Sequence, residues 1–199
     1  MLQSIISLDI SALNYIRWLI NPSSNIQVEL VKFLADFWVI FVAILLVWLW
    51  LFWVYKKKDK PKERALILFY SIAFSFLIYV ILNLGLPLRP RPETVSAIRP
   101  LVDHLPDNSF PSWHAIFAGA AILASFFFCW KKWIIWSVII ISVLMLISRI
   151  IAWIHYPSDI LGGVVVGFIA ALVIFIIKKP LEKYVVNPLI DLAHKLRLA

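Results

Sequence analysis

Residues 37–64 read FWVIFVAILLVWLWLFWVYKKKDKPKER, and this stretch decides the fold. Its first part, Phe37–Tyr55, carries no charge, whereas the nine residues that follow are mostly basic. A bilayer core of about 30 Å needs about 20 apolar helical residues, so we expect the first part to cross a membrane. Short loops rich in lysine and arginine stay on the cytoplasmic side, so residues 56–64 predict the cytoplasmic face.

Four further apolar segments extend this pattern along the chain. Two of them end at the lysine pairs 131–132 and 178–179, which would then lie on the same face as residues 56–64. We therefore predict an all-α, polytopic membrane helical bundle that forms one domain over residues 1–199. Its five predicted spans are 37–55, 65–86, 112–130, 133–151 and 159–177.

The composition agrees with a lipid solvent. Of 199 residues, 63% are hydrophobic and only 15% are charged, against about 25% charged in a typical globular domain. The net charge of +8 comes with lysines clustered between apolar runs, which favours membrane orientation over nucleic-acid binding. The single cysteine, Cys129, excludes an intrachain disulfide framework.

Both ends of the chain mix apolar and charged residues at helical spacing. Residues 1–27 predict an amphipathic helix lying in the membrane interface, with the N-terminus outside and five crossings. If this segment crosses instead, the bundle has six. Residues 180–199 predict a second amphipathic helix, as a tail on the cytoplasmic side.

Polar residues gather at the outer ends of the second to fifth spans. Guanidinium groups bind phosphate oxygens bidentately and stay charged when partly buried, so this set predicts an anion site. A snorkelling arginine near a helix end is the alternative explanation for Arg149. The set comprises Arg89, Arg91, Glu93, Arg99, Asp103, His104, Asp107, Ser109, Ser112, His114, Ser148, Arg149, His155 and Asp159.

Two spacings sharpen this prediction. Ser112 and His114 follow a proline at the start of the third span, where free helix amides favour an anion. His155 and Asp159 are four residues apart, so a helical turn would let the carboxylate bond one ring nitrogen and leave the other nucleophilic. The alternatives are a polar residue at the membrane interface for His114 and an ordinary helix cap by Asp159.

Together these residues carry a family resemblance. Pro111-Ser112-Trp113-His114, then Ser148-Arg149, His155 and Asp159, resemble the second and third signature motifs of the type-2 phosphatidic acid phosphatase superfamily. Arg91-Pro92 is similar to the end of its first motif, although Leu84 stands where that motif has a lysine. The resemblance covers about residues 66–167. Residues 101–112 are similar to its branch of bacterial undecaprenyl pyrophosphate phosphatases, although Glu93 and Trp113 depart from that branch's pattern.

The resemblance implies a role for each matched position. His155 would be the nucleophile that forms a phosphohistidine, Asp159 would orient its ring, and His114 would be the general acid and then the base. No metal or other cofactor is implied. The phosphate oxygens would be held by Arg91, Arg149, Ser112 and the amides near Trp113, with Arg89 or Arg99 replacing the absent lysine.

We therefore expect a metal-independent lipid phosphatase in the bacterial inner or plasma membrane, with its site facing the periplasm or the exterior. Its partners would be the membrane and a lipid phosphate or pyrophosphate, with undecaprenyl pyrophosphate as the expected substrate. Phosphatidylglycerophosphate, phosphatidic acid and a lipid A phosphate are alternative substrates. A non-catalytic transporter or scaffold with an anion patch is the alternative of a different class.

Overall fold

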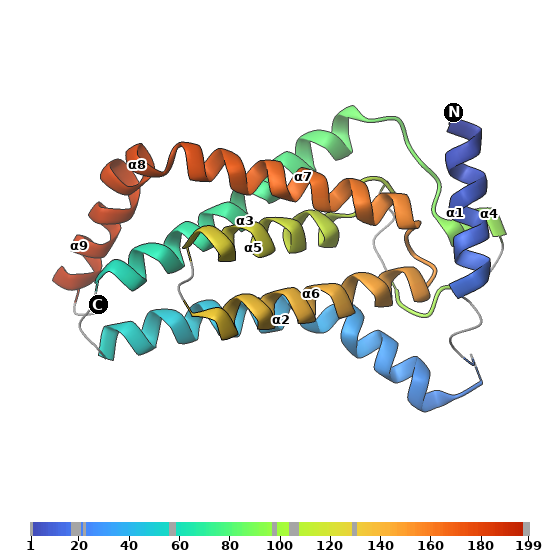
Figure 1. Cartoon of the computed structure of the whole chain (residues 1–199), viewed down its shortest axis with the longest axis horizontal. Coiled ribbons are helices and arrows are strands. Elements are labelled where there is room, and N and C mark those ends of the chain that lie inside the picture. The colour runs from blue at the N-terminus through green and yellow to red at the C-terminus, as the bar shows by residue number, and fades with distance from the viewer. Residues whose placement is uncertain are drawn as a thin grey trace.

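The structure is a computed structural model that describes residues 2–16, 21, 23–55, 59–96, 99–103, 108–128 and 131–196, without the side chains of residues 2–5, 52–55 and 96. This part of the chain is helical and holds no strand, which confirms the predicted fold class (Figure 1). Its elements are α1 (Leu2–Ile16), α2 (Asn25–Tyr55), α3 (Asp59–Gly85), α4 (Pro92–Ser96), α5 (Trp113–Phe128), α6 (Lys132–Ile151), α7 (Pro157–Ile176), α8 (Lys178–Leu181), a π-helical turn (Glu182–Val186) and α9 (Asn187–Lys195).

The helices α2, α3, α5, α6 and α7 run along the long axis of the molecule and form the bundle (Figure 1). α5 lies at its centre, where it contacts α3, α6 and α7. α1 and α4 lie at one end of the bundle, whereas α8 and α9 lie at the other. The described lysine clusters are at the starts of α3 and α6 and at the end of α7. These three helix ends lie together at the end of the bundle opposite α1.

Four helices of the described chain, α2, α3, α6 and α7, are long and apolar enough to cross a membrane. The helix in the predicted span 112–130 is α5, which has 16 residues and is shorter than the others. Most of its side chains are buried by neighbouring helices, so protein rather than lipid surrounds it. His104, Asp107 and Cys129 lie outside the described residues.

α2 begins twelve residues before the predicted span 37–55. Its first turns carry the i, i+3 ion pair of Glu29 with Lys32, at 2.8 Å. Val31 and Ala35 are buried against the segment that follows α6. Tertiary packing therefore extends this helix beyond its apolar run and places Asp36 beside the outer end of α6.

The terminal segments are helical but differ in detail from the predicted pair. Residues 1–27 hold α1, and residues 25–27 already belong to α2. The tail is helical over α8, a π turn and α9, in which Val186 and Ile190 are buried in a core cluster with Ile67 and Leu68 of α3. The tail therefore packs against the bundle through its apolar face.

Candidate active site

The predicted site residues meet at the end of the bundle that carries α1. They come from the segment before α4, the start of α5, the end of α6 and the start of α7. Eight members of the predicted polar set are almost completely buried: Arg91, Ser109, Ser112, His114, Ser148, Arg149, His155 and Asp159. Burial of so many ionisable groups is costly unless they bind one another, so their contacts define the site.

The turn between α6 and α7 brings Arg149 and His155 to the same place. Trp153 has a left-handed φ of 63°, which is uncommon for a bulky residue and closes the end of α6. The amide of Ile154 then donates to the carbonyl oxygen of Arg149, as in a Schellman cap. α7 starts at Pro157, whose fixed φ suits the first helical position.

The ring of His155 is held at both nitrogens. Nδ1 lies 3.1 Å from the carbonyl oxygen of Ser109, which can only accept, so Nδ1 carries the proton. Nε2 is then the unprotonated nitrogen, 3.4 Å from Nη1 of Arg91. Arg91 Nη1 is itself held by the carbonyl oxygen of Ile154, at 2.6 Å. His155 therefore presents a lone pair next to a buried guanidinium group.

Burial lowers the pKa of His155 to about 4. Asp159 raises this pKa, whereas the positive charges of Arg91 and Arg149 lower it. The ring is therefore neutral at neutral pH, and a neutral imidazole is the nucleophilic form.

Asp159 does not make the expected hydrogen bond to His155, because its Oδ2 lies 3.8 Å from Nδ1. Oδ2 instead accepts from the hydroxyl of Ser109 at 2.6 Å and from the amide of Tyr156 at 2.9 Å. The carboxylate is therefore close enough to interact electrostatically with the ring. It also holds Ser109, whose carbonyl oxygen accepts from Nδ1, and the backbone of Tyr156, which follows the histidine.

The second histidine is held by the second buried arginine. Nη2 of Arg149 lies 2.5 Å from Nδ1 of His114, and a guanidinium can only donate, so neutral His114 carries its proton on Nε2. Nη1 of Arg149 pairs with Asp36 at 3.2 Å. His114 also interacts electrostatically with Arg91 and His155, so the two histidine–arginine pairs share one site.

Ser112 and Trp113 form the start of α5 in this site. The hydroxyl oxygen of Ser112 is fully buried and has no hydrogen-bond partner among the described residues. Its amide donates to the carbonyl oxygen of Asp159 at 3.3 Å, which ties α5 to α7. The ring of Trp113 lies against that of His114 in a tilted arrangement, with ring centroids 3.4 Å apart and an interplanar angle of 33°. The first amides of a helix have no acceptor within it, so those of Trp113 and His114 point to where an anion would bind.

Arg89, which the sequence suggests as a phosphate-binding replacement for the missing lysine, is instead paired with two carboxylates. Its guanidinium pairs with Asp159 Oδ1 at 2.6 Å and with Asp9 Oδ2 at 2.7 Å, and it stacks over Tyr156. Two carboxylates therefore compensate its charge. The other proposed substitute, Arg99, lines a cavity of about 510 Å³ beside Lys32 and Asp36.

Comparisons with known proteins identify the family of this chain. The family model of the PAP2 superfamily matches residues 64–182, which include every site residue except Asp9 and Asp36. The chain belongs to the PAP2 superfamily. The described part of this PAP2 chain holds no group of three or more histidine, cysteine or acidic side chains that could bind a metal ion.

Three similar proteins illustrate the relationship. The PAP2 chain is 37% identical to "Bacitracin transport permease protein BcrC" of Bacillus licheniformis over 41% of this chain and 39% of that protein. It is also 37% identical to "Undecaprenyl-diphosphatase BcrC" of Bacillus subtilis over 43% and 44%. The chain thus spans about two fifths of these curated relatives. The crystal structure of a transmembrane PAP2-type phosphatidylglycerolphosphate phosphatase from Bacillus subtilis superposes with a TM-score of 0.70 at 20% identity, over 91% of this chain and 89% of that one.

Sequence reasoning missed two acidic residues of this PAP2 site. Asp36 lies just before an uncharged run and looks like a span boundary, whereas Asp9 looks like the polar face of an amphipathic helix. No spacing links either residue to its partner, because Asp36 is 113 residues from Arg149 and Asp9 is 80 residues from Arg89. Ser109 belongs to the predicted polar set, but the sequence does not predict that its hydroxyl donates to Asp159 or that its carbonyl oxygen accepts from His155.

Proposed function

We propose that this chain is a membrane phosphatase that converts undecaprenyl pyrophosphate to undecaprenyl phosphate by transferring a phosphoryl group to His155. One observation carries the chemistry. The His155 ring is fixed with Nδ1 protonated against the Ser109 carbonyl and Nε2 facing Arg91. The similarity to undecaprenyl-diphosphatase BcrC of Bacillus subtilis supports the substrate class.

In the first half-reaction, Nε2 of His155 attacks the terminal phosphorus. The Nε2–P bond forms as the bond between phosphorus and the bridging oxygen breaks. His114 would enter this step with both ring nitrogens protonated, once the negative charge of the bound pyrophosphate has drawn Arg149 away from Nδ1. It would then pass its Nε2 proton to the bridging oxygen and become neutral, with Nε2 free to act as a base. The phosphorylated ring becomes cationic. Asp159, 3.8 Å from Nδ1, stabilises that charge while Ser109 continues to accept the Nδ1 proton.

In the second half-reaction, His114 takes a proton from water and the resulting hydroxide attacks phosphorus. The Nε2–P bond breaks, inorganic phosphate leaves and His155 returns to its neutral form. The negative charge on the equatorial oxygens would be stabilised by Arg91, Arg149 and the first amides of α5. Ser112, whose hydroxyl is buried, would donate to one of these oxygens.

The site would face the exterior or the periplasm. It lies at the end of the bundle opposite the described lysine clusters, and lysine-rich ends stay in the cytoplasm. A site at the membrane boundary suits a substrate whose phosphates are in water and whose isoprenoid chain is in lipid.

The test uses full-length protein purified in detergent. We expect phosphate release from undecaprenyl pyrophosphate with no added metal, and no release by a folded His155→Ala variant. Equal release by that variant would refute the nucleophile. No release from any lipid phosphate by the wild-type protein would favour the transporter or scaffold alternative.

The second candidate substrate is phosphatidylglycerophosphate, because the superposed structure from Bacillus subtilis is that of a phosphatidylglycerolphosphate phosphatase. Phosphatidic acid and a lipid A phosphate belong in the same comparison. The values of kcat/KM in one detergent would rank them, and we expect undecaprenyl pyrophosphate to have the highest. A higher value for a glycerolipid would keep the chemistry and change the substrate.

A further inference from the structure

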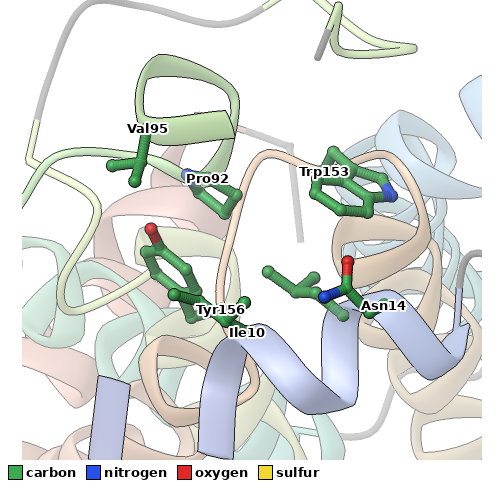
Figure 2. Close-up of a pocket in the computed structure, with 7 residues that line it drawn as sticks. Ile10, Asn14, Pro92, Val95, Trp153 and Tyr156 are labelled. Atoms are coloured by element: carbon green, nitrogen blue, oxygen red, sulfur yellow. The ribbon is translucent and has the colours of Figure 1, made fainter. Parts of the chain in front are cut away.

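The N-terminal helix α1 lies across the end of the bundle that holds the site (Figure 1). Leu13 is 2% exposed and forms a small core cluster with Trp153 and Tyr156, which flank His155. Figure 2 shows Ile10 and Asn14 of α1 on one side of a cavity of about 230 Å³, opposite residues from α4 and from the turn after α6. α1 therefore rests directly on the segment that contains His155.

Asp9 is the polar centre of this contact. Its side chain is buried, although a carboxylate on an amphipathic surface helix normally faces water. Oδ1 accepts from the amide of Ser158 at 3.0 Å, and Oδ2 accepts from the hydroxyl of Ser158 at 2.5 Å. Ser158 is in the first turn of α7, so Asp9 supplies, from another helix, the carboxylate that a helix N-terminus favours.

Arg89 connects this carboxylate to Asp159. Nη2 of Arg89 pairs with Asp9 at 2.7 Å, and Nη1 pairs with Asp159 at 2.6 Å. Nη1 also donates to the hydroxyl of Ser158 at 2.8 Å. The guanidinium is thus fixed between two carboxylates, and one of these holds Ser109 and the amide of Tyr156 on either side of the His155 ring.

We propose that Asp9 is a positioning residue of the phosphatase site: it fixes Arg89 and the first turn of α7, and through them the arrangement of Asp159 around His155. This inference rests on the proposed function for its kinetic consequence. It makes α1 part of the catalytic unit, whereas the alternative is that Asp9 only anchors α1 to the bundle.

Asp9→Asn separates these two roles. The amide oxygen of asparagine can still accept from the Ser158 amide, so the attachment of α1 is largely kept. Its NH₂ group replaces the oxygen that faces Arg89, and two donors cannot bond to each other. Arg89 then loses one of its two carboxylates and the geometry that this carboxylate imposes on Asp159.

The kinetic experiment compares Asp9→Asn with Ser11→Ala, a control on the same helix. Ser11 is exposed, and its hydroxyl donates to the carbonyl oxygen of Ser7 within its own helix. Since a misplacement of about 1 Å can cost about 100-fold in rate, we expect kcat of Asp9→Asn to fall by about 10- to 100-fold with little change in KM. We expect wild-type kinetics for Ser11→Ala. Wild-type kcat for Asp9→Asn would overturn the proposal.

A second readout does not depend on activity. Histidine labelled with ¹⁵N reports the protonation and hydrogen bonding of each ring nitrogen, and His155→Gln assigns the His155 signals. We expect Asp9→Asn to shift the His155 signals and Ser11→Ala to leave them unchanged. Unshifted signals in Asp9→Asn would overturn the positioning role whether or not the protein is a phosphatase. Shifted signals in a protein without phosphatase activity would support positioning and refute the proposed function.

A third variant covers the case in which Asp9→Asn does not fold. Ser158→Ala removes the hydroxyl that bonds both Asp9 and Arg89 but keeps both charges. We expect a smaller shift of the same His155 signals, and a few-fold fall in kcat. A folded Ser158→Ala protein with the wild-type spectrum and the wild-type kcat would contradict the proposed connection from Asp9 through Arg89 to Asp159.

Discussion

Gly167→Ala should separate two helices that carry opposite sides of the site. Gly167 is buried in α7, where that helix packs directly on the backbone of α5. A Cβ atom there would lie 2.1 Å from the carbonyl oxygen of Ile116 and 2.6 Å from the amide nitrogen of Ala120, whereas ordinary contacts begin at 3.4 Å. The backbone of α5 cannot rotate away as a side chain can, so the helices must move apart by about 1 Å.

This movement has two measurable consequences. Overpacking of a tight interface costs about 1–3 kcal/mol, so the thermal midpoint in detergent should fall. α5 carries His114, whereas α7 begins two residues after His155, so the separation of the two histidines should change as well. A displacement of about 1 Å can cost about 100-fold in rate, and we expect kcat to fall by about that factor.

The assay is phosphate release with a melting curve on the same preparation. Gly85→Ala is the matched control, because a Cβ atom at Gly85 meets nothing within 4 Å. That variant should keep the wild-type midpoint and kcat. If Gly167→Ala also keeps both, the close contact between α5 and α7 does not position the histidines, and this reasoning is refuted.

Three further predictions concern the site itself. Arg149→Lys should lower kcat/KM by about 100-fold or more, because one ammonium group cannot bond His114, Asp36 and a phosphate oxygen in the geometry of a guanidinium. Steady-state kinetics measure this effect, and a near-normal kcat/KM would contradict the prediction. Since the pKa of His155 is lowered to about 4, protonation of the nucleophile should reduce kcat/KM only below about pH 4. The unfolded chain binds a proton at this histidine below about pH 6.5, so the free energy of unfolding should fall as the pH is lowered from 6.5 to 4. The His155→Ala variant should show a weaker dependence of this free energy on pH. A pKa of 6.5 in the pH profile of kcat/KM would argue against a buried neutral ring. Finally, EDTA should leave phosphate release unchanged, and recovery of a lost activity on addition of Mg²⁺ would refute the metal-independent mechanism.

The membrane bundle could be predicted from the sequence because hydropathy is a local property. The uncharged run 37–55 indicates a span without knowledge of neighbouring helices, whereas the orientation that the following basic residues predict stays a prediction. The boundaries depend on packing and could not be predicted in the same way. α2 starts at Asn25 because Val31 and Ala35 find buried positions against the turn after α6.

The candidate catalytic residues could also be proposed from the sequence, because the motifs around His114 and His155 are short and continuous in the chain. Their partners were not. The sequence suggests that Asp159 bonds His155 four residues earlier, whereas the fold brings the Ser109 carbonyl closer to that ring. Asp9 and Arg89 are paired only because α1 folds back over the start of α7, and no periodicity encodes that contact.

The most direct test of the central claim is to identify the phosphorylated residue. Wild-type protein and the His155→Ala variant would be mixed with substrate labelled in its terminal phosphate, quenched within milliseconds, digested and mapped by mass spectrometry. We predict an acid-labile, base-stable phosphate on His155 of the wild-type protein, formed and lost at rates consistent with turnover, and no label in His155→Ala. Label on another residue, or turnover by His155→Ala at the wild-type rate, would contradict the account.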